Sequence, residues 1–286
     1  MREPLKTPDS ALRSLDKMLI YLNVNSAFVS VASLDSGVFI GSLELLIRLC
    51  YPKAAILERS RAIDKPGCIR MRFPVFITFE GIEGSGKSTQ IARAYEYLSD
   101  KGYPCLRTRE PGGTLFGAAL REILLKPDET RREPRSELLL YLADRHQHLK
   151  EVIEPALEQG MVVLCDRYQD ATRAYQGAAR GIPTEDVEAL SRLLGIIEPD
   201  KTILLDLEPE IGLARALRRN TLDSAAAAEG RFEAEDLSFH ARVREAYLRL
   251  VERSPQRFFV VPAADAPDAI FARIAEQLDR WLPGLK

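Results

Sequence analysis

A glycine-rich stretch in the first half of the chain combines the residue types that hold the phosphates of a nucleotide. Residues 81–88 match the pattern GxxxxGK[ST] at every fixed position. Glycines let successive backbone N–H groups point at an anion, Lys87 can reach the β- and γ-phosphates, and the Ser88 hydroxyl can ligate Mg²⁺. The expected phosphate-binding residues are Gly81, Ile82, Glu83, Gly84, Ser85, Gly86, Lys87, Ser88 and Thr89.

Two further segments carry arginines that could bind a second anion. Thr108-Arg109-Glu110-Pro111-Gly112-Gly113-Thr114 and Asp166-Arg167-Tyr168 each follow an apolar, strand-like run. Ligands bind where the strands of a parallel sheet end, and the planar guanidinium of arginine can donate two hydrogen bonds to a phosphate. We therefore expect an anionic second substrate beside the nucleotide.

Three classes of protein share such a phosphate loop: small-molecule kinases, GTPase switches, and motor or transporter ATPases. An NKxD-type sequence that would read guanine is absent from the chain, and so is the LSGGQ-like signature of transporter ATPases. The many arginines that follow the loop favour a kinase with a second, anionic substrate.

The elements that position these residues alternate between strand and helix. Apolar runs rich in β-branched and aromatic residues predict five strands, at 75–79, 104–108, 161–165, 202–207 and 257–261. Helical spacing of apolar residues predicts helices from Ser88 to about Gly102 and at 115–125, 137–150, 184–194, 209–219 and 267–281. Strands that are apolar on both faces predict an α/β fold, a five-stranded parallel sheet with helices on both faces.

The first 70 residues are separate from this pattern. Met71-Arg72-Phe73-Pro74 resembles a natural start directly before the first strand, so residues 1–70 are expected to be an extension without a catalytic part, and possibly the product of a misassigned start. Residues 18–34 carry no charge but contain several Asn and Ser, which argues against a membrane span. With 286 residues and a net charge of −2, nothing predicts a nucleic-acid partner.

Cysteine and histidine show no metal-site spacing. Cys105 and Cys165 lie in apolar strand-like runs and are expected to be reduced thiols in a cytoplasmic protein. The three histidines, His146, His148 and His240, form no cluster and are expected at the surface.

Several motifs, taken in order, resemble those of the thymidylate kinase family. They are FEGIEGSGKST, TREPGGT, ADR, DRYxxxxxAYQGxxRG and an Arg-rich segment before Phe232-Glu233. The likeness runs from about Phe73 to the C-terminus. It implies a P-loop NTPase fold with a mobile lid at about 215–235, and transfer of the γ-phosphate of ATP to dTMP with Mg²⁺, for dTTP synthesis. It also implies a homodimer in the cytoplasm.

The resemblance also implies roles for single residues in holding dTMP. Tyr141 would stack on thymine, Arg145 would donate to its O4 atom, and Thr172 would lie near N3. Tyr175 would lie beneath the sugar with Gln176 beside it. The dTMP phosphate would be held by Arg109, Arg121 and Arg167.

Phosphoryl transfer needs alignment and charge neutralisation more than a strong base, because the acceptor is already a phosphate dianion. The residues expected to act in catalysis are Lys87, Arg167, Glu83, Asp166 and a lid arginine. Arg231 is the first choice for the lid arginine, followed by Arg215, Arg218 and Arg219. Asp166 either orients water on Mg²⁺ or pairs with Arg167.

Two alternatives remain open on the sequence alone. One is another nucleoside or deoxynucleoside monophosphate kinase. The other is a P-loop regulatory protein in which slow hydrolysis drives a conformational switch. The segment 220–230 is expected to be mobile, although its four consecutive alanines favour helix.

Overall fold

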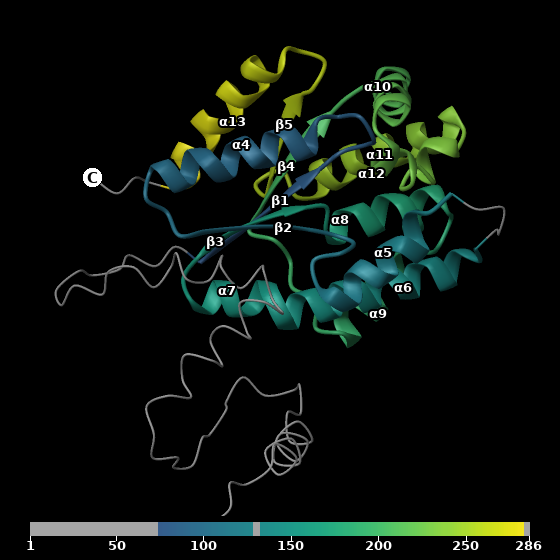
Figure 1. Cartoon of the computed structure of the whole chain (residues 1–286). Coiled ribbons are helices and arrows are strands. Elements are labelled where there is room, and N and C mark those ends of the chain that lie inside the picture. The colour runs from purple at the N-terminus through teal and green to yellow at the C-terminus, as the bar shows by residue number, and fades with distance from the viewer. Residues whose placement is uncertain (1–73, 128–131, 283–286) are drawn as a thin grey trace, which may run out of the picture. The chain divides into compact units, whose positions relative to one another are not determined.

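A single sheet of parallel strands organises the chain in the computed structural model, which describes residues 74–127 and 132–282 (Figure 1). The strands are β1 Val75–Glu80, β2 Cys105–Arg109, β3 Val162–Asp166, β4 Lys201–Asp206 and β5 Phe258–Pro262. Their order across the sheet is β2-β3-β1-β4-β5, and every neighbouring pair is parallel. The predicted five-stranded parallel α/β fold is therefore confirmed.

The register of the central strands brings the expected site residues to one edge. Asp166, the last residue of β3, pairs with Phe79 of β1 on one side and with Arg109 of β2 on the other. Because parallel strands end at the same edge, the loop that follows β1 lies beside Arg109 and Arg167. Segments that lie up to 86 residues apart in the sequence therefore meet at the same edge of the sheet.

Helices cover both faces of the sheet. On one face, α4 Lys87–Asp100 and α13 Pro267–Trp281 lie side by side (Figure 1) and pack against Ile77 and Phe79. On the other, Phe76 packs against Leu149 and Ile153 of the π-helix η1 Leu149–Ile153. Alternate residues of β1 therefore enter two separate cores, as the apolar character of the strand predicted.

The remaining helices carry or flank the site. They are α5 Leu115–Leu125, α6 Pro134–His148, α7 Glu154–Glu158, α8 Gln169–Thr172, the π-helix η2 Arg173–Ala179, α9 Thr184–Leu193, α10 Pro209–Leu222, α11 Ser224–Ala227, the 3₁₀ turn η3 Phe232–Ala234 and α12 Leu237–Arg253. Helices α5 and α13 have the predicted bounds, and α10 runs three residues beyond its predicted end. Helix α12 and the α8–η2 helix were not predicted.

The lid segment is more helical than expected. Helix α10 reaches Leu222, and α11 follows after Asp223, whose side chain accepts a hydrogen bond from the Ala226 N–H at 3.3 Å. Such a cap, together with the high helix propensity of alanine, accounts for the helical backbone. The mobility of residues 220–230 stays a prediction.

Residues 1–70, including the uncharged stretch at 18–34, lie outside the described residues. Among the helices that the model does describe, none combines the length and the apolar character that crossing a bilayer requires.

Candidate active site

The phosphate loop is held in shape by its glycines and by Lys87. Gly84 has φ +68°, and a Cβ on it would lie 2.1 Å from the carbonyl oxygen of Gly212 in α10, so only glycine fits there. The Lys87 ammonium donates to the carbonyl oxygens of Gly81 and Ile82 at 2.9 and 2.7 Å. Burial, reinforced by the positive charge of Arg167, lowers the pKa of Lys87 to about 8. The lysine is thus fixed at the position where the loop meets phosphate.

Arg167 joins the phosphate loop to the helical segment η2. It is the one non-glycine residue with positive φ, +67°, in the part of the chain that the structure describes. Its guanidinium donates to the Gly81 carbonyl oxygen at 3.1 Å and to Glu83 Oε1 at 2.7 Å, and lies 4.9 Å from the centre of the Tyr175 ring. The Arg167 guanidinium therefore contacts both the phosphate loop and Tyr175 of η2.

Glu83, within the loop, is a buried carboxylate with several donors. Oε1 accepts from Arg167 and from the Tyr175 hydroxyl at 2.7 Å each, and His240 Nδ1 lies 3.3 Å from Oε2. Burial alone would raise the pKa of Glu83, but Arg167, His240 and Lys87 outweigh it and hold the pKa well below its usual range. Glu83 is therefore ionised across the physiological range.

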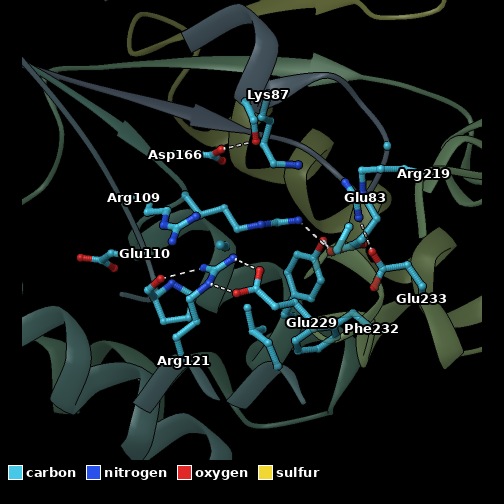
Figure 2. A pocket seen from close by; sticks show the side chains of 18 of the residues that line it. Glu83, Lys87, Arg109, Glu110, Arg121, Asp166, Arg219, Glu229, Phe232 and Glu233 are labelled. Atoms are coloured by element: carbon cyan, nitrogen blue, oxygen red, sulfur yellow. Dashed lines mark hydrogen bonds and ion pairs between the residues drawn. The ribbon is translucent and has the colours of Figure 1, made fainter. Parts of the chain in front are cut away.

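A cavity of about 730 Å³ opens beside the loop (Figure 2). All eight residues predicted to bind the second substrate line it: Arg109, Arg121, Tyr141, Arg145, Arg167, Thr172, Tyr175 and Gln176. From the loop and the catalytic set, the lining includes Glu83, Gly84, Gly86, Lys87, Ser88, Thr89 and Asp166. Gly81, Ile82, Ser85 and Arg231 are not among the lining residues.

The deep end of the cavity is organised by Arg145 on α6. Only 1% of this residue is exposed. Its Nε donates to Glu110 Oε2 and its Nη1 to Thr172 Oγ1, both at 2.8 Å. Tyr141 lies one helical turn earlier on the same helix and is also buried. The two side chains predicted to meet the base are thus adjacent and rigidly held.

Arg109 and Arg121 lie at the mouth, where Figure 2 shows Arg121 against Glu229. Arg121 donates from Nε and Nη2 to the two oxygens of Glu229 at 2.7 and 2.6 Å, and from Nη1 to the Pro111 carbonyl oxygen at 2.7 Å. Its hydrogen bond to Arg121 lowers the pKa of Glu229, with further contributions from Arg109 and Arg219. The lid thus places a carboxylate among the arginines expected to hold a phosphate.

The structure does not bring Arg231 to the phosphate loop. Its guanidinium pairs with the buried Glu137 of α6, and Nη1 donates to the Leu124 carbonyl oxygen at 3.0 Å, near the end of α5. Helix ends carry unpaired carbonyls that attract a cation, which accounts for this placement. Arg215 and Arg219 of α10 line the cavity instead.

Asp166 and Ser88 place two side-chain oxygen groups next to each other at the loop. The Ser88 hydroxyl donates to Asp166 Oδ2 at 2.9 Å. Arg167 directs its guanidinium to Gly81 and Glu83 rather than to its neighbour Asp166. Mg²⁺ prefers oxygen ligands and is usually bound by one or two protein groups together with substrate phosphates. The donor set therefore fits a nucleotide-bound Mg²⁺.

Two histidines expected at the surface are buried, which corrects that prediction. His148, at the end of α6, has Nδ1 2.9 Å from Glu110 Oε1 and Nε2 2.7 Å from Thr108 Oγ1. His240 lies against Glu83. Both ring nitrogens of His148 have polar partners, whereas His240 pairs through Nδ1 and its Nε2 is buried without a hydrogen-bond partner. Isolated histidines give no signal of such contacts in sequence. His146, in contrast, is half-buried.

Sequence reasoning also missed Glu80, Glu110, Glu137 and Glu229. The first three are buried, and each accepts hydrogen bonds from residues at or beside the cavity. Glu80 and Glu110 lie within the motifs FEG and REPGGT, so the sequence indicated that both lie beside strand ends. Their burial and their partners depend on contacts between distant segments.

The chain is similar to known proteins in sequence and in fold. The family model described as thymidylate kinase matches residues 79–274. A thymidylate kinase of Solidesulfovibrio magneticus is 52% identical over 197 residues, which cover 68% of this chain and 94% of that protein. One of Desulfosudis oleivorans is 48% identical over 207 residues, covering 72% and 97%. The crystal structure of a thymidylate kinase from Ehrlichia chaffeensis is 31% identical with a TM-score of 0.58, covering 72% of this chain and 99% of that one.

Proposed function

The chain belongs to the thymidylate kinase family, and from that premise we propose how its own residues perform the reaction. The enzyme transfers the γ-phosphate of ATP to dTMP and gives dTDP and ADP. The observation that carries the proposal is Arg167, which bonds Gly81 and Glu83 of the phosphate loop while it covers the Tyr175 ring. Donor and acceptor phosphates bound on its two sides would lie close enough for transfer.

The donor side is the phosphate loop. Its backbone N–H groups and the N-terminal end of α4 would hold the β- and γ-phosphates, because both present partial positive charge. Lys87 would turn from the Gly81 and Ile82 carbonyls toward the γ-phosphate. Ser88 and Asp166 would hold Mg²⁺, which neutralises phosphate charge when it is bound.

The acceptor side is the remainder of the cavity. Tyr141 would stack on thymine and Arg145 would donate to O4, with Thr172 near N3. The Tyr175 ring would lie beneath the sugar beside Gln176, whose amide Nε2 donates to Glu137 Oε1 at 2.8 Å. Arg109 and Arg121 would bind the dTMP phosphate, and Glu83 would lie near the 3′-hydroxyl.

Closure of the lid would supply a further positive charge. Arg231 is bound to Glu137 and to the end of α5, and Arg215 donates to the carbonyl oxygens of Ala263 and Ala264 at 2.9 and 3.1 Å. Arg219 is half-exposed and lines the cavity, and its Nη2 donates to the buried Glu233 at 2.8 Å and to Asn220 Oδ1 at 3.3 Å. We therefore assign the closing role to Arg219 rather than to Arg231.

One assay tests the proposed chemistry. The release of ADP from ATP is followed with dTMP, dUMP, dCMP, dGMP and dAMP in parallel, for the wild-type enzyme and Arg167→Ala. The expected result is release that depends on dTMP and falls about 10³-fold in the variant. Hydrolysis of ATP that ignores the acceptor would instead support a regulatory switch.

The broader features of the protein follow from the same premise. Residues 71–286 would form the kinase domain, with the lid at about 215–235, and residues 1–70 an extension without a catalytic part. The family match at 79–274 supports this division. Peptides from before Met71 in the native protein, found by mass spectrometry, would reject a start at that residue. Cytoplasmic location is supported by the free thiols of Cys105 and Cys165 and is tested by cell fractionation.

A homodimer is supported by apolar side chains on two adjacent helices. Leu115, Phe116 and Ile123 of α5 and Leu139 of α6 are all at least half-exposed, and the two helices pack together. Apolar residues gathered in this way are typical of an interface, and we assign this one to a second copy. Sedimentation of the wild-type protein and of Leu139→Glu tests this assignment. The wild-type protein should sediment as a dimer and the variant as a monomer.

A further inference from the structure

Glu80 is a buried carboxylate that the reaction itself does not use. It is the last residue of β1, directly precedes Gly81 of the phosphate loop, and has no exposed surface. Its two oxygens accept hydrogen bonds from two different parts of the chain, the turn after β3 and helix α12. Burial of a charged carboxylate costs free energy unless hydrogen-bond donors stabilise it. The donors that contact Glu80 therefore indicate its role.

The first partner belongs to the turn that aims Arg167. A left-handed backbone is unfavourable for a non-glycine residue and persists only where the surroundings fix it. Two hydrogen bonds hold the turn on either side of Arg167. Its own N–H donates to the Phe79 carbonyl oxygen at 3.0 Å, and the next N–H, of Tyr168, donates to Glu80 Oε1 at 2.8 Å.

The same bond fixes the start of the helix that lines the acceptor side. Tyr168 directly precedes the continuous helical segment formed by α8 and η2. Helix N-termini favour a nearby negative charge. Thr172, Tyr175 and Gln176 on this segment all line the cavity. The angle at which the segment leaves β3 therefore depends on the position of the Glu80 carboxylate.

The second partner ties the carboxylate to the element that follows the lid. The Tyr247 hydroxyl of α12 donates to Glu80 Oε2 at 2.7 Å, and the Tyr247 ring lies 6.5 Å from that of Tyr175. Only 1% of Tyr247 is exposed. Held at both oxygens, Glu80 cannot rotate away from the Tyr168 N–H.

We infer that Glu80 is a positioning residue for phosphoryl transfer: by holding the turn at Arg167–Tyr168, it fixes the Arg167 guanidinium between the phosphate loop and the acceptor segment. The inference rests on the proposed role of Arg167. It assigns to Glu80 no contact with either substrate. Its effect on kcat should therefore pass through Arg167 and largely vanish where Arg167 is missing, whereas displacement of the α8–η2 segment should appear in the KM for dTMP.

A double-mutant cycle tests this dependence. Glu80→Ala should lower kcat about 100-fold, because a displacement of about 1 Å at the reacting groups has an effect of that size. It should change the KM for ATP far less, because the loop N–H groups remain. In an Arg167→Ala background, the same change should lower kcat by no more than about twofold, since the two residues act as one unit. Equal losses in both backgrounds would overturn the inference.

Conservative changes give a second readout and guard against unfolding of Glu80→Ala. Glu80→Gln can still accept from the Tyr168 N–H and donate to the Tyr247 oxygen, so it should keep kcat within about threefold. Tyr247→Phe should lower kcat several-fold. Its matched control is Tyr103→Phe, which removes the buried hydroxyl that donates to the Leu282 carbonyl oxygen at 2.7 Å, remote from the site. A Tyr247→Phe enzyme with the kcat of the control contradicts the inference. A wild-type enzyme without dTMP-dependent ADP release contradicts the proposed function instead.

Discussion

Both carboxylate oxygens of Glu229 bind the guanidinium of Arg121, at 2.7 and 2.6 Å. A phosphate dianion would use the same fork of N–H groups, because carboxylate and phosphate both accept two parallel hydrogen bonds from arginine. Glu229 comes from the lid, whereas Arg121 lies on α5 at the mouth of the cavity. A dTMP phosphate that binds Arg121 must therefore displace a side chain of the protein.

Removal of the Glu229 charge should tighten the binding of dTMP. In Glu229→Gln the competing ion pair is lost, and since such partly exposed pairs contribute about 0.2–1 kcal/mol, the KM for dTMP should fall up to about fivefold. The difference from the wild type should shrink at high salt. Steady-state kinetics at two ionic strengths measures both effects. Glu276→Gln, which breaks an exposed pair with Arg280, is the control and should change neither. A higher KM in Glu229→Gln would show that Glu229 orients Arg121 for the phosphate.

Two arginines at opposite ends of the lid should have different roles. Arg219→Ala should lower kcat by about 10³-fold, the lower range for an arginine that stabilises a phosphoryl-transfer transition state, with little change in stability. Its side chain is half-exposed, so water screens its ion pair with Glu233 and the pair contributes little to stability. The measurements are kcat at saturating substrates and the thermal midpoint.

Arg231→Ala should act mainly on stability. The substitution removes a partner of the buried Glu137, which keeps the Gln176 amide and a longer contact with Arg180, at 3.5 Å. Loss of one member of a buried pair destabilises strongly, and with these remaining partners we expect up to about 3 kcal/mol. A variant with a wild-type thermal midpoint and a large loss of kcat would return the closing role to Arg231.

The sequence predicted the elements whose signals are local. The strands β1 and β3 are mostly apolar before their last residues, Glu80 and Asp166, and α5 and α13 begin after Thr114 and Ala266 with clear helical spacing. The bounds of these four elements were therefore found to within about a residue. Helix α12 was missed although Phe239, Val243 and Tyr247 have helical spacing and Asp236 caps its first turn by accepting from the Phe239 N–H. The charged residues between them obscured that pattern.

The sequence predicted those site residues that belong to short motifs. It did not predict contacts between residues that lie far apart in the sequence. Lys87 and Arg167 have their positions fixed by short sequence patterns at strand ends. The pairing of Arg231 with Glu137 joins segments 94 residues apart, and the burial of His240 depends on the packing of α12 over the phosphate loop. Neither spacing nor composition records such contacts, so the sequence could not show that Arg231 pairs with Glu137.

The Glu80 carboxyl should make the stability of the protein depend on pH. Burial, with the negative charge of Asp170, raises its pKa from 4.5 to about 7, against the opposing effects of Arg167 and the Tyr247 hydroxyl. An acid with a raised folded-state pKa contributes its full stability below the unfolded value of 4.5 and loses it as the pH rises toward 7. Glu80→Gln cannot ionise and escapes this loss.

The stability of Glu80→Gln relative to the wild type should therefore increase with pH. Between pH 5.5 and pH 8.0 the difference in unfolding free energy should grow by roughly 2 kcal/mol, or about 4–8 °C in thermal midpoint for a domain of this size. Unfolding curves of both proteins at the two pH values provide the test. If the unfolding free energies of the two proteins changed in the same way with pH, Glu80 would have the same protonation state in the folded and the unfolded protein.

Arg145 should determine which base the enzyme accepts. An arginine has five N–H groups, and four of those on Arg145 bond to Glu110, Gln169, Thr172 and the Tyr168 carbonyl oxygen. One donor is left for the substrate, fixed in direction by the other four. Thymine and uracil present an accepting oxygen at position 4, whereas cytosine presents an amino group that donates. The geometry of Arg145 thus favours dTMP and dUMP over dCMP.

Arg145→Lys keeps the positive charge but loses the planar fork, so kcat/KM for dTMP and dUMP should fall together by about 10- to 100-fold, the effect of one charged hydrogen bond. Activity with dCMP should change far less, so the preference for dTMP over dCMP should narrow. Arg173→Lys is the control, because Arg173 is a half-buried arginine that is paired with Asp170, Glu188 and Glu198 and does not line the cavity. The control should lose stability and retain the preference. If Arg145→Lys also retained the preference for dTMP over dCMP, base recognition would have to come from Thr172 or Tyr141 instead, the other lining residues that we assign to the base.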